Sequence, residues 1–177
     1  ASQKAFALPP GLGFMSVSKK ALDYAANSNI RGFYFDILDY VANLKRGQTP
    51  FTPAVSLVNQ LEKRLEKITK EGLEHFRLRY IENTDYLRNG LKQMDFNILA
   101  KNPANCVSAV LVKEVDASLI VKIMREKYNI EIAPSGGELK TKLFRIGNYG
   151  NIGKYEIDMC LKALKLAKEE AYANKNI

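Results

Sequence analysis

The spacing of apolar residues predicts two consecutive amphipathic helices in the middle of the chain. From about residue 54, apolar side chains recur three and four positions apart and form one stripe. A second stripe of the same period begins at Leu73 and runs to about Met94, and Gly72 separates the two. We therefore expect a helical pair, or one kinked helix, that crosses between two domains. The first stripe consists of Val55, Val58, Leu61, Leu65 and Ile68.

The segment before this pair predicts short elements joined by a proline loop. Residues 12–17 form an apolar run after a Pro-Pro-Gly turn, which is consistent with a buried strand. Residues 19–26 and 36–44 are predicted helices. Residues 46–53 contain Pro50 and Pro53, which restrict φ and lack N–H donors, so this stretch is expected to be a loop.

The segment after Asp95 predicts a small α+β domain. Its order is β-β-α-β-β-α, which favours an antiparallel sheet with helices on one face. Asp116 is a good N-cap for the first of its helices, and the polar tail at 174–176 is expected to fray. The expected strands are 96–100, 107–113, 130–133 and 142–147, and the expected helices are 117–128 and about 154–173.

Composition narrows the class of protein. The chain has 177 residues, of which 46% are apolar and 26% charged, so a globular core is expected and general disorder is excluded. Its longest apolar runs fall short of the roughly 18 residues that a membrane span needs. The net charge of +8 allows an anionic partner. However, the basic residues of 62–71 alternate with glutamates, which is typical of a solvated helix face rather than a nucleic-acid surface.

The cysteines and the single histidine limit the metal and redox chemistry. Cys106 and Cys160 do not form a CxxC pair, and we interpret them as reduced thiols of an intracellular protein. With His75 as the only histidine, a zinc site is not expected. His75 itself is interpreted as structural.

Lys4 is the first candidate for chemistry. It lies in Ser-Gln-Lys-Ala-Phe-Ala-Leu-Pro-Pro-Gly, among small and apolar groups. Desolvation disfavours an ammonium ion, so a lysine in such surroundings would have a nucleophilic amine, as a Schiff base requires. On composition alone, an exposed lysine near the start of the chain is the simpler interpretation.

Arg145 and the proline loop are candidates for anion binding. On a strand, Arg145 shares a face with Leu143 and Gly147, and its guanidinium can hold a carboxylate by two parallel hydrogen bonds. The alternative is an arginine on an edge strand that extends into water. Thr49 and Thr52 could meet a phosphate, and the alternative for them is local capping of a turn.

Five segments in register resemble a known family. They are SQKAFALPPGLGFMSVS, GFYFDILDY, QTPFTPAVSL, YNIEIA followed by Gly-Gly, and LFRIG. Together they resemble class V aminotransferases of fold type I, in particular the alanine–glyoxylate and serine–pyruvate group. The resemblance implies an α/β fold in two parts. Residues 1–72 would be the end of the large pyridoxal-phosphate domain, and residues 73–177 would be the small α+β domain.

The same resemblance implies roles for individual residues. Lys4 would carry pyridoxal phosphate as a Schiff base and move a proton at the substrate's α-carbon. Gln3 would contact the phosphate or the ring, and Thr52 would reach the phosphate of the neighbouring subunit in a homodimer. Arg145 would bind the substrate α-carboxylate. The family often has His-Met after FRIG, whereas this chain has Asn148-Tyr149, so its side-chain specificity does not follow from the resemblance.

The implied enzyme is a cytoplasmic aminotransferase with no metal, membrane or nucleic-acid partner. It would transfer an amino group from alanine, serine or a similar small amino acid to a 2-oxo acid such as glyoxylate or pyruvate. The chain opens at Ala1-Ser2-Gln3-Lys4 and is about half the family's length, so we expect it to be the C-terminal half. The aromatic ring that stacks on the cofactor and the Asp that pairs with its ring nitrogen would lie upstream.

Three alternatives remain at this point. The chain could be a non-catalytic half that only binds a partner polypeptide, or a basic nucleic-acid-binding module. It could also be a lyase or desulfurase of the same fold. A desulfurase needs a mobile nucleophilic cysteine, whereas Cys106 and Cys160 fall in a predicted strand and a predicted helix, which argues against that activity.

Overall fold

The computed structural model describes residues 1–29 and 32–174. The chain divides into two compact units, Ala1–Glu66 and Lys67–Ile177. The tail that was expected to fray lies outside the described residues after position 174.

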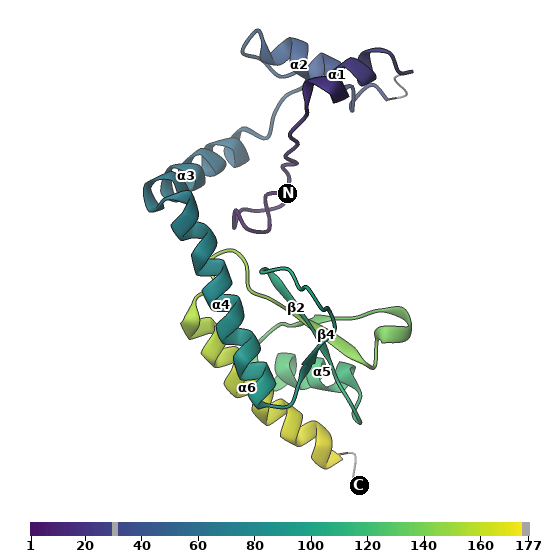
Figure 1. Cartoon of the computed structure of the whole chain (residues 1–177), viewed down its shortest axis with the longest axis vertical. Coiled ribbons are helices and arrows are strands. Elements are labelled where there is room, and N and C mark those ends of the chain that lie inside the picture. The colour runs from purple at the N-terminus through teal and green to yellow at the C-terminus, as the bar shows by residue number, and fades with distance from the viewer. Residues whose placement is uncertain (30–31, 175–177) are drawn as a thin grey trace. The chain divides into compact units, whose positions relative to one another are not determined.

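The first unit contains two short helices, both at the predicted places. Helix α1 spans Lys19–Ala26, and the side chain of Ser18 caps it by accepting a hydrogen bond from Ala21 N. Helix α2 spans Ile37–Leu44 and is capped in the same way by Asp36. Figure 1 shows α1 and α2 next to one another, and they are in contact.

The predicted strand at residues 12–17 is wrong. This stretch does not form a strand, and positions 13–16 are exposed. A strand needs a neighbour whose N–H and C=O groups pair with its own. The described part of the first unit contains helices and loops but no second strand, so the apolar run has nothing to pair with.

The central helical pair is confirmed. Helix α3 spans Val55–Glu71 and α4 spans Leu73–Gln93, and Gly72 separates them with a φ of 91°. A residue with a side chain rarely adopts this φ, which explains why glycine stands at the break. Arg79 bridges the break, because its Nε and Nη2 donate to the two carboxylate oxygens of Glu71 at 3.0 and 3.2 Å.

The second unit contains the predicted antiparallel sheet. Its strands are β1 (Asn97–Ile98), β2 (Val107–Leu111), β3 (Ala133–Pro134) and β4 (Leu143–Gly147), in the spatial order β1-β2-β4-β3. Helix α5 (Ala117–Tyr128) follows β2, and α6 (Lys154–Ala173) follows β4. Together with a short 3-10 turn at Gly137–Leu139, these elements give the expected β-β-α-β-β-α order.

The third strand lies further along the chain than predicted. We expected it at 130–133, but β3 begins only at Ala133. Asn129 ends α5 in the left-handed conformation, with a φ of 53°, and Ile130 N donates back to Met124 O. The chain is therefore still completing the helix end where the apolar pattern suggested a strand.

One face of the sheet packs against helices. Figure 1 shows α4 and α6 side by side, and α5 contacts both α6 and β4. The core between them includes Leu87 and Leu91 of α4, and Phe144 of β4, all fully buried. Even-numbered positions of β4 face this core, and odd-numbered positions face the opposite side, where Arg145 lies.

Candidate functional site

The turn that carries Lys4 is held by a buried serine. Ser2 is 0% exposed, and its hydroxyl donates to Pro9 O at 2.7 Å and accepts from Leu12 N at 3.2 Å. Its backbone N–H donates to Leu12 O, and its carbonyl accepts from Leu8 N. These hydrogen bonds close the segment from residue 2 to residue 12 into one folded loop, which fixes the position of the Lys4 backbone.

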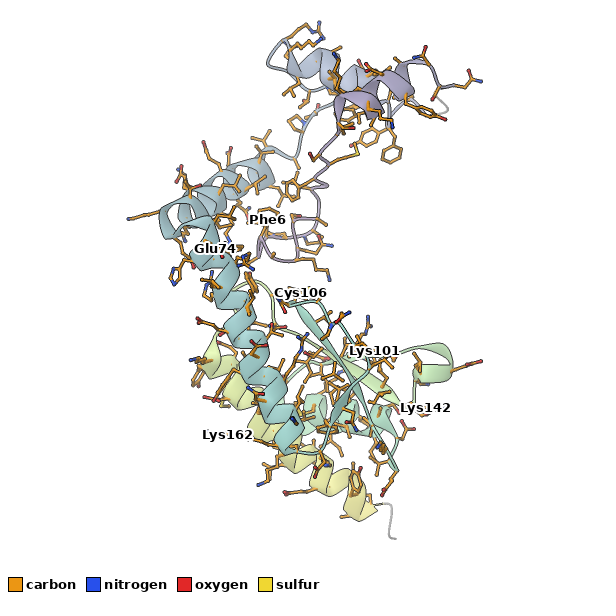
Figure 2. All side chains as sticks on the ribbon, in the orientation of Figure 1. Phe6, Glu74, Lys101, Cys106, Lys142 and Lys162 are labelled. Atoms are coloured by element: carbon orange, nitrogen blue, oxygen red, sulfur yellow. The ribbon has the colours of Figure 1, made fainter. Side chains whose placement is uncertain are left out.

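The side chains of Gln3 and Lys4 lie outside this loop and are exposed. Phe6, labelled in Figure 2, contacts Phe14 with ring centroids 4.9 Å apart and ring planes tilted by 57°. Phe6 and Phe14 thus pack on one another within this segment. Of the two interpretations of Lys4 that composition left open, the exposed lysine is the one that the structure of this chain shows.

Thr52 is exposed in the predicted proline loop. The neighbouring Thr49 hydroxyl donates to Phe51 O at 2.7 Å, so Thr49 has the local capping role that was the alternative to phosphate binding. Phe51 also contacts the rings of Phe33 and Tyr34, at centroid distances of 5.3 and 4.8 Å. The loop is thus anchored by Phe51, next to which the Thr52 hydroxyl is accessible.

Arg145 belongs to the second unit and lies in the interior of the sheet. Strand β4 has β2 on one side and β3 on the other, so Arg145 is not on an edge strand as the alternative interpretation had it. It faces Ala109 in the register and is exposed on the face away from the helices. Within the described residues its guanidinium makes one hydrogen bond, from Nη2 to Pro134 O at 3.0 Å. The Arg145 guanidinium therefore has further N–H donors that can bind an anion.

A polar face of α4 holds the segments next to Arg145, and the sequence analysis did not identify it. Tyr80 OH donates to Gly150 O and accepts from Gly150 N, both at 3.1 Å. Thr84, 0% exposed, donates to Asn105 O at 2.8 Å and accepts from Asn148 Nδ2 at 2.5 Å. The signal for this face was present, since Tyr80, Thr84 and Arg88 are spaced by four residues.

Arg88 completes this arrangement at the start of β2. Its Nη2 donates to Ala104 O at 2.7 Å and to Val107 O at 3.2 Å, and its Nε donates to Ser108 Oγ at 3.1 Å. Burial lowers the pKa of the Arg88 guanidinium, although the nearby Asp85 acts in the opposite direction. Cys106, which Figure 2 labels just before β2, accepts a hydrogen bond from Asn148 N at 3.1 Å.

A family model described as aminotransferase class I and II matches residues 4–164. The chain belongs to this aminotransferase family. The match begins at Lys4 and extends over both units of the fold. The predicted resemblance to fold type I aminotransferases is thereby confirmed.

Relatives and solved structures agree with this assignment. The chain is 34% identical over 155 residues to the L-aspartate–glyoxylate aminotransferase of Paracoccus denitrificans, covering 85% of this chain and 39% of that one. It is 31% identical over 179 residues to the serine–glyoxylate aminotransferase of Hyphomicrobium methylovorum, covering 98% and 44%. The structure of pyridoxamine–pyruvate aminotransferase from Mesorhizobium loti is 28% identical, with a TM-score of 0.83 and coverage of 94% and 45%.

The chain spans about half the length of the curated relatives that it matches. Within that span the fold class is the predicted one, a mixed helical structure with a small antiparallel sheet. The predicted cofactor, pyridoxal phosphate, is confirmed at the level of the family.

The donor groups of this aminotransferase chain fit that cofactor. An aldehyde is bound by a primary amine, which Lys4 offers on a turn that the buried Ser2 holds in place. A phosphate is bound by hydroxyl and amide donors, which Thr52 and Gln3 offer at exposed positions. Each group is thus accessible on a segment that hydrogen bonds or ring contacts fix.

The two cysteines differ in their surroundings, and one prediction about them needs correction. Cys106 lies in the turn before β2, not in a strand, and is exposed. Cys160 is buried in α6 at the wall of a pocket of about 380 Å³, and burial raises the pKa of its thiol to about 11. A thiol with so high a pKa is a poor nucleophile near neutral pH, which argues against Cys160 as the cysteine of a desulfurase.

Charged groups on the described surface are spread over separate elements. Figure 2 labels Lys101 between β1 and β2, Lys142 before β4 and Lys162 on α6. In the described ranges, His, Cys, Asp and Glu side chains do not gather in a group of three that could hold a metal ion. None of the described helices is both long and apolar enough to cross a membrane.

Proposed function

We propose that the protein containing this chain is a pyridoxal-phosphate-dependent aminotransferase. It transfers the amino group of a small amino acid, such as alanine or serine, to a 2-oxo acid such as glyoxylate or pyruvate. The observation that carries this proposal is the family match over residues 4–164, which includes Lys4, Thr52 and Arg145. The names of the relatives, glyoxylate aminotransferases for serine and for aspartate, support the choice of acceptor.

The proposal assigns the two parts of the chain to two domains. Residues 1–72 are the end of the large cofactor-binding domain, and residues 73–177 are the small domain. The two compact units divide slightly earlier, after Glu66 within α3, and the interruption of the helical backbone at Gly72 supports the later boundary. Lys4 then belongs to the large domain and Arg145 to the small one.

When bound, pyridoxal phosphate supplies an aldehyde that takes up the amino group and a conjugated ring that accepts the electron pair left at the α-carbon. The residues of this chain supply binding and proton transfer. Lys4 Nζ holds the cofactor in the resting enzyme, removes the α-proton of the substrate and later returns a proton. Gln3 and Thr52 contact the cofactor, and Arg145 orients the α-carboxylate by two parallel hydrogen bonds.

We further propose that the enzyme is a cytoplasmic homodimer in which Thr52 of one subunit contacts the cofactor of the other. The large exposed area around the proline loop supports an interface there, since Phe33 and Phe35 are 85% and 86% exposed. The free thiols of Cys106 and Cys160 support a reducing compartment.

The proposed activity is tested by substituting Lys4 in the complete enzyme. Lys4→Ala should reduce transamination between alanine and glyoxylate by more than about 1000-fold, because general base and nucleophile are lost together. Lys20→Ala is a matched control, since Lys20 is an equally exposed lysine of the first unit and should leave the rate unchanged. A Lys4→Ala enzyme with near-normal turnover would remove Lys4 from the mechanism.

The shared site is tested by mixing two variants, each of which lacks one proposed contact with the cofactor. Lys4→Ala and Thr52→Ala dimers, unfolded and refolded together, form hybrids in which one of the two sites carries both wild-type residues. The mixture should then exceed the summed activity of the separate variants, up to about a quarter of the wild-type value. A mixture no more active than that sum would mean that Lys4 and Thr52 serve the same site within one subunit.

A further inference from the structure

Gly147 lacks a side chain for reasons of space rather than conformation. It is the last residue of β4, two positions after Arg145, and its φ is in the ordinary range for any residue. A Cβ atom built on Gly147 would lie 2.9 Å from Tyr149 Cε1 and 3.4 Å from Tyr149 Cζ. The tyrosine ring therefore occupies the position that a side chain at 147 would need.

This contact places the Tyr149 ring on the same face of the sheet as Arg145. Odd-numbered positions of β4 point away from the helical core, so Gly147 and Arg145 share a face. Directly across from Arg145 lies Ala109, whose side chain is a single methyl group. The neighbour on the other side, Ala133 of β3, is also an alanine. Along β4 on this face, the bulk next to Arg145 therefore comes from Leu143 on one side and from the Tyr149 ring over Gly147 on the other.

The backbone that carries Tyr149 is fixed on both sides. Asn148 N donates to Cys106 O at 3.1 Å, and Gly150 exchanges two hydrogen bonds with the hydroxyl of Tyr80. These bonds hold the backbone of Tyr149, and the contact with Gly147 gives its ring a defined position over the strand. The ring can therefore exclude a group by size, which a mobile loop residue cannot do.

We propose that Tyr149 is a specificity-determining residue for the carboxylate that Arg145 binds. Its ring, which lies over Gly147, limits the size of the substrate whose carboxylate Arg145 binds and so favours small amino acids. The inference rests on the proposed function, because it takes Arg145 as the carboxylate site.

The ring is tested first by removal in the complete enzyme. Tyr149→Ala should raise the ratio of kcat/KM for 2-aminohexanoate over that for alanine by at least about tenfold, since a pocket discriminates by roughly this factor for each methylene. Tyr149→Phe keeps the ring and should leave the ratio within about twofold of wild type. A ratio unchanged in Tyr149→Ala would overturn the proposal, as would an equal change in Tyr149→Phe.

Gly147→Ala tests the contact between Gly147 and the Tyr149 ring without altering the tyrosine. The added methyl group should displace the ring and change the same ratio, but it should have little effect once Tyr149 is alanine. The four enzymes with residues 147 and 149 varied singly and together form a double-mutant cycle. Strong coupling is expected, and additive effects would contradict the contact on which the proposal depends.

A binding measurement separates this inference from the proposed function. Propionate and hexanoate are titrated by calorimetry against wild type, Arg145→Lys and Tyr149→Ala, with no turnover required. Both ligands should bind more weakly to Arg145→Lys, and Tyr149→Ala should improve hexanoate binding relative to propionate. If Arg145→Lys has no effect, the carboxylate site and the inference both fail. If only the Tyr149→Ala effect is absent, the inference alone fails.

Discussion

The hydroxyl of Thr84 is expected to contribute measurably to stability, and Thr84→Val tests this. Valine has nearly the shape of threonine, so the substitution removes hydrogen bonds without opening a cavity. Thr84 is 0% exposed, and its hydroxyl accepts from Asn148 Nδ2 at 2.5 Å and contacts the carbonyls of Tyr80 and Asn105 at 2.6 and 2.8 Å. The substitution removes the partner of the Asn148 amide N–H and the hydroxyl donor to the Asn105 carbonyl.

The magnitude follows from the burial of Asn148. Only 1% of Asn148 is exposed, and its Oδ1 already lacks a hydrogen-bond partner among the described residues. Without the Thr84 hydroxyl, both polar atoms of this amide would be buried and unpaired. An unsatisfied buried group costs about 1–3 kcal/mol, so we expect Thr84→Val to lower the free energy of unfolding by about 2 kcal/mol. With a urea m-value of about 2 kcal/mol/M, the midpoint falls by ~1 M.

Urea unfolding followed by far-ultraviolet circular dichroism measures this change. Thr141→Val is the control, because Thr141 is exposed, and its free energy of unfolding should stay within about 0.5 kcal/mol of wild type. Asn148→Ala removes the other partner, and the double variant with Thr84→Val should lose less than the sum of the two losses. A Thr84→Val midpoint equal to wild type, or strictly additive losses, would refute the reasoning.

Three further predictions concern separate parts of the chain. Arg145→Lys should lower kcat/KM for alanine and serine alike by ~30- to ~1000-fold in the complete enzyme, and a loss confined to one donor would mean that Arg145 binds the side chain. Iodoacetamide at about pH 8 should modify the exposed Cys106 in the native protein and spare Cys160, whose burial raises its pKa to about 11. Mass spectrometry of the peptides measures the two modifications, and faster modification of Cys160 than of Cys106 would contradict the prediction. Glu156 accepts a hydrogen bond from Gly153 N at 2.9 Å, which lowers the pKa of its carboxyl. The ionised carboxylate therefore stabilises the protein above the pKa that Glu156 has in the unfolded state, and this contribution is lost as the pH falls through its lower pKa in the folded state. Glu156→Ala should lower the Tm at neutral pH and leave it unchanged at about pH 2. A difference in Tm that does not depend on pH would contradict this.

The helices and most of the sheet could be predicted because local signals coincide with tertiary packing. The three-and-four spacing of α3 and α4, the break at Gly72 and the cap at Asp116 are all local features. The errors occur where pairing depends on distant residues. The apolar run at 12–17 would need a partner strand, and the placement of β3 depends on how α5 ends at Asn129.

The candidate site was accessible to sequence analysis only as a set of residue types. The pattern around residue 145 places Arg145 on a strand, and the structure agrees. The sequence could not decide between a desolvated and an exposed Lys4, because the exposure depends on which groups pack around the amine. The contacts of Thr84 with Asn148 and of Tyr149 with Gly147 join side chains through the folded backbone, and no spacing rule reveals them.

The central claim is that Lys4 carries pyridoxal phosphate, and covalent trapping tests it most directly. The complete protein is incubated with pyridoxal phosphate, reduced with borohydride and digested, and the modified peptide is sequenced by mass spectrometry. The account predicts a phosphopyridoxyl group on Lys4 in stoichiometric yield, lost in the Lys4→Ala variant and retained in Lys20→Ala. Modification of other lysines at the same yield, or none at all on Lys4, would contradict it.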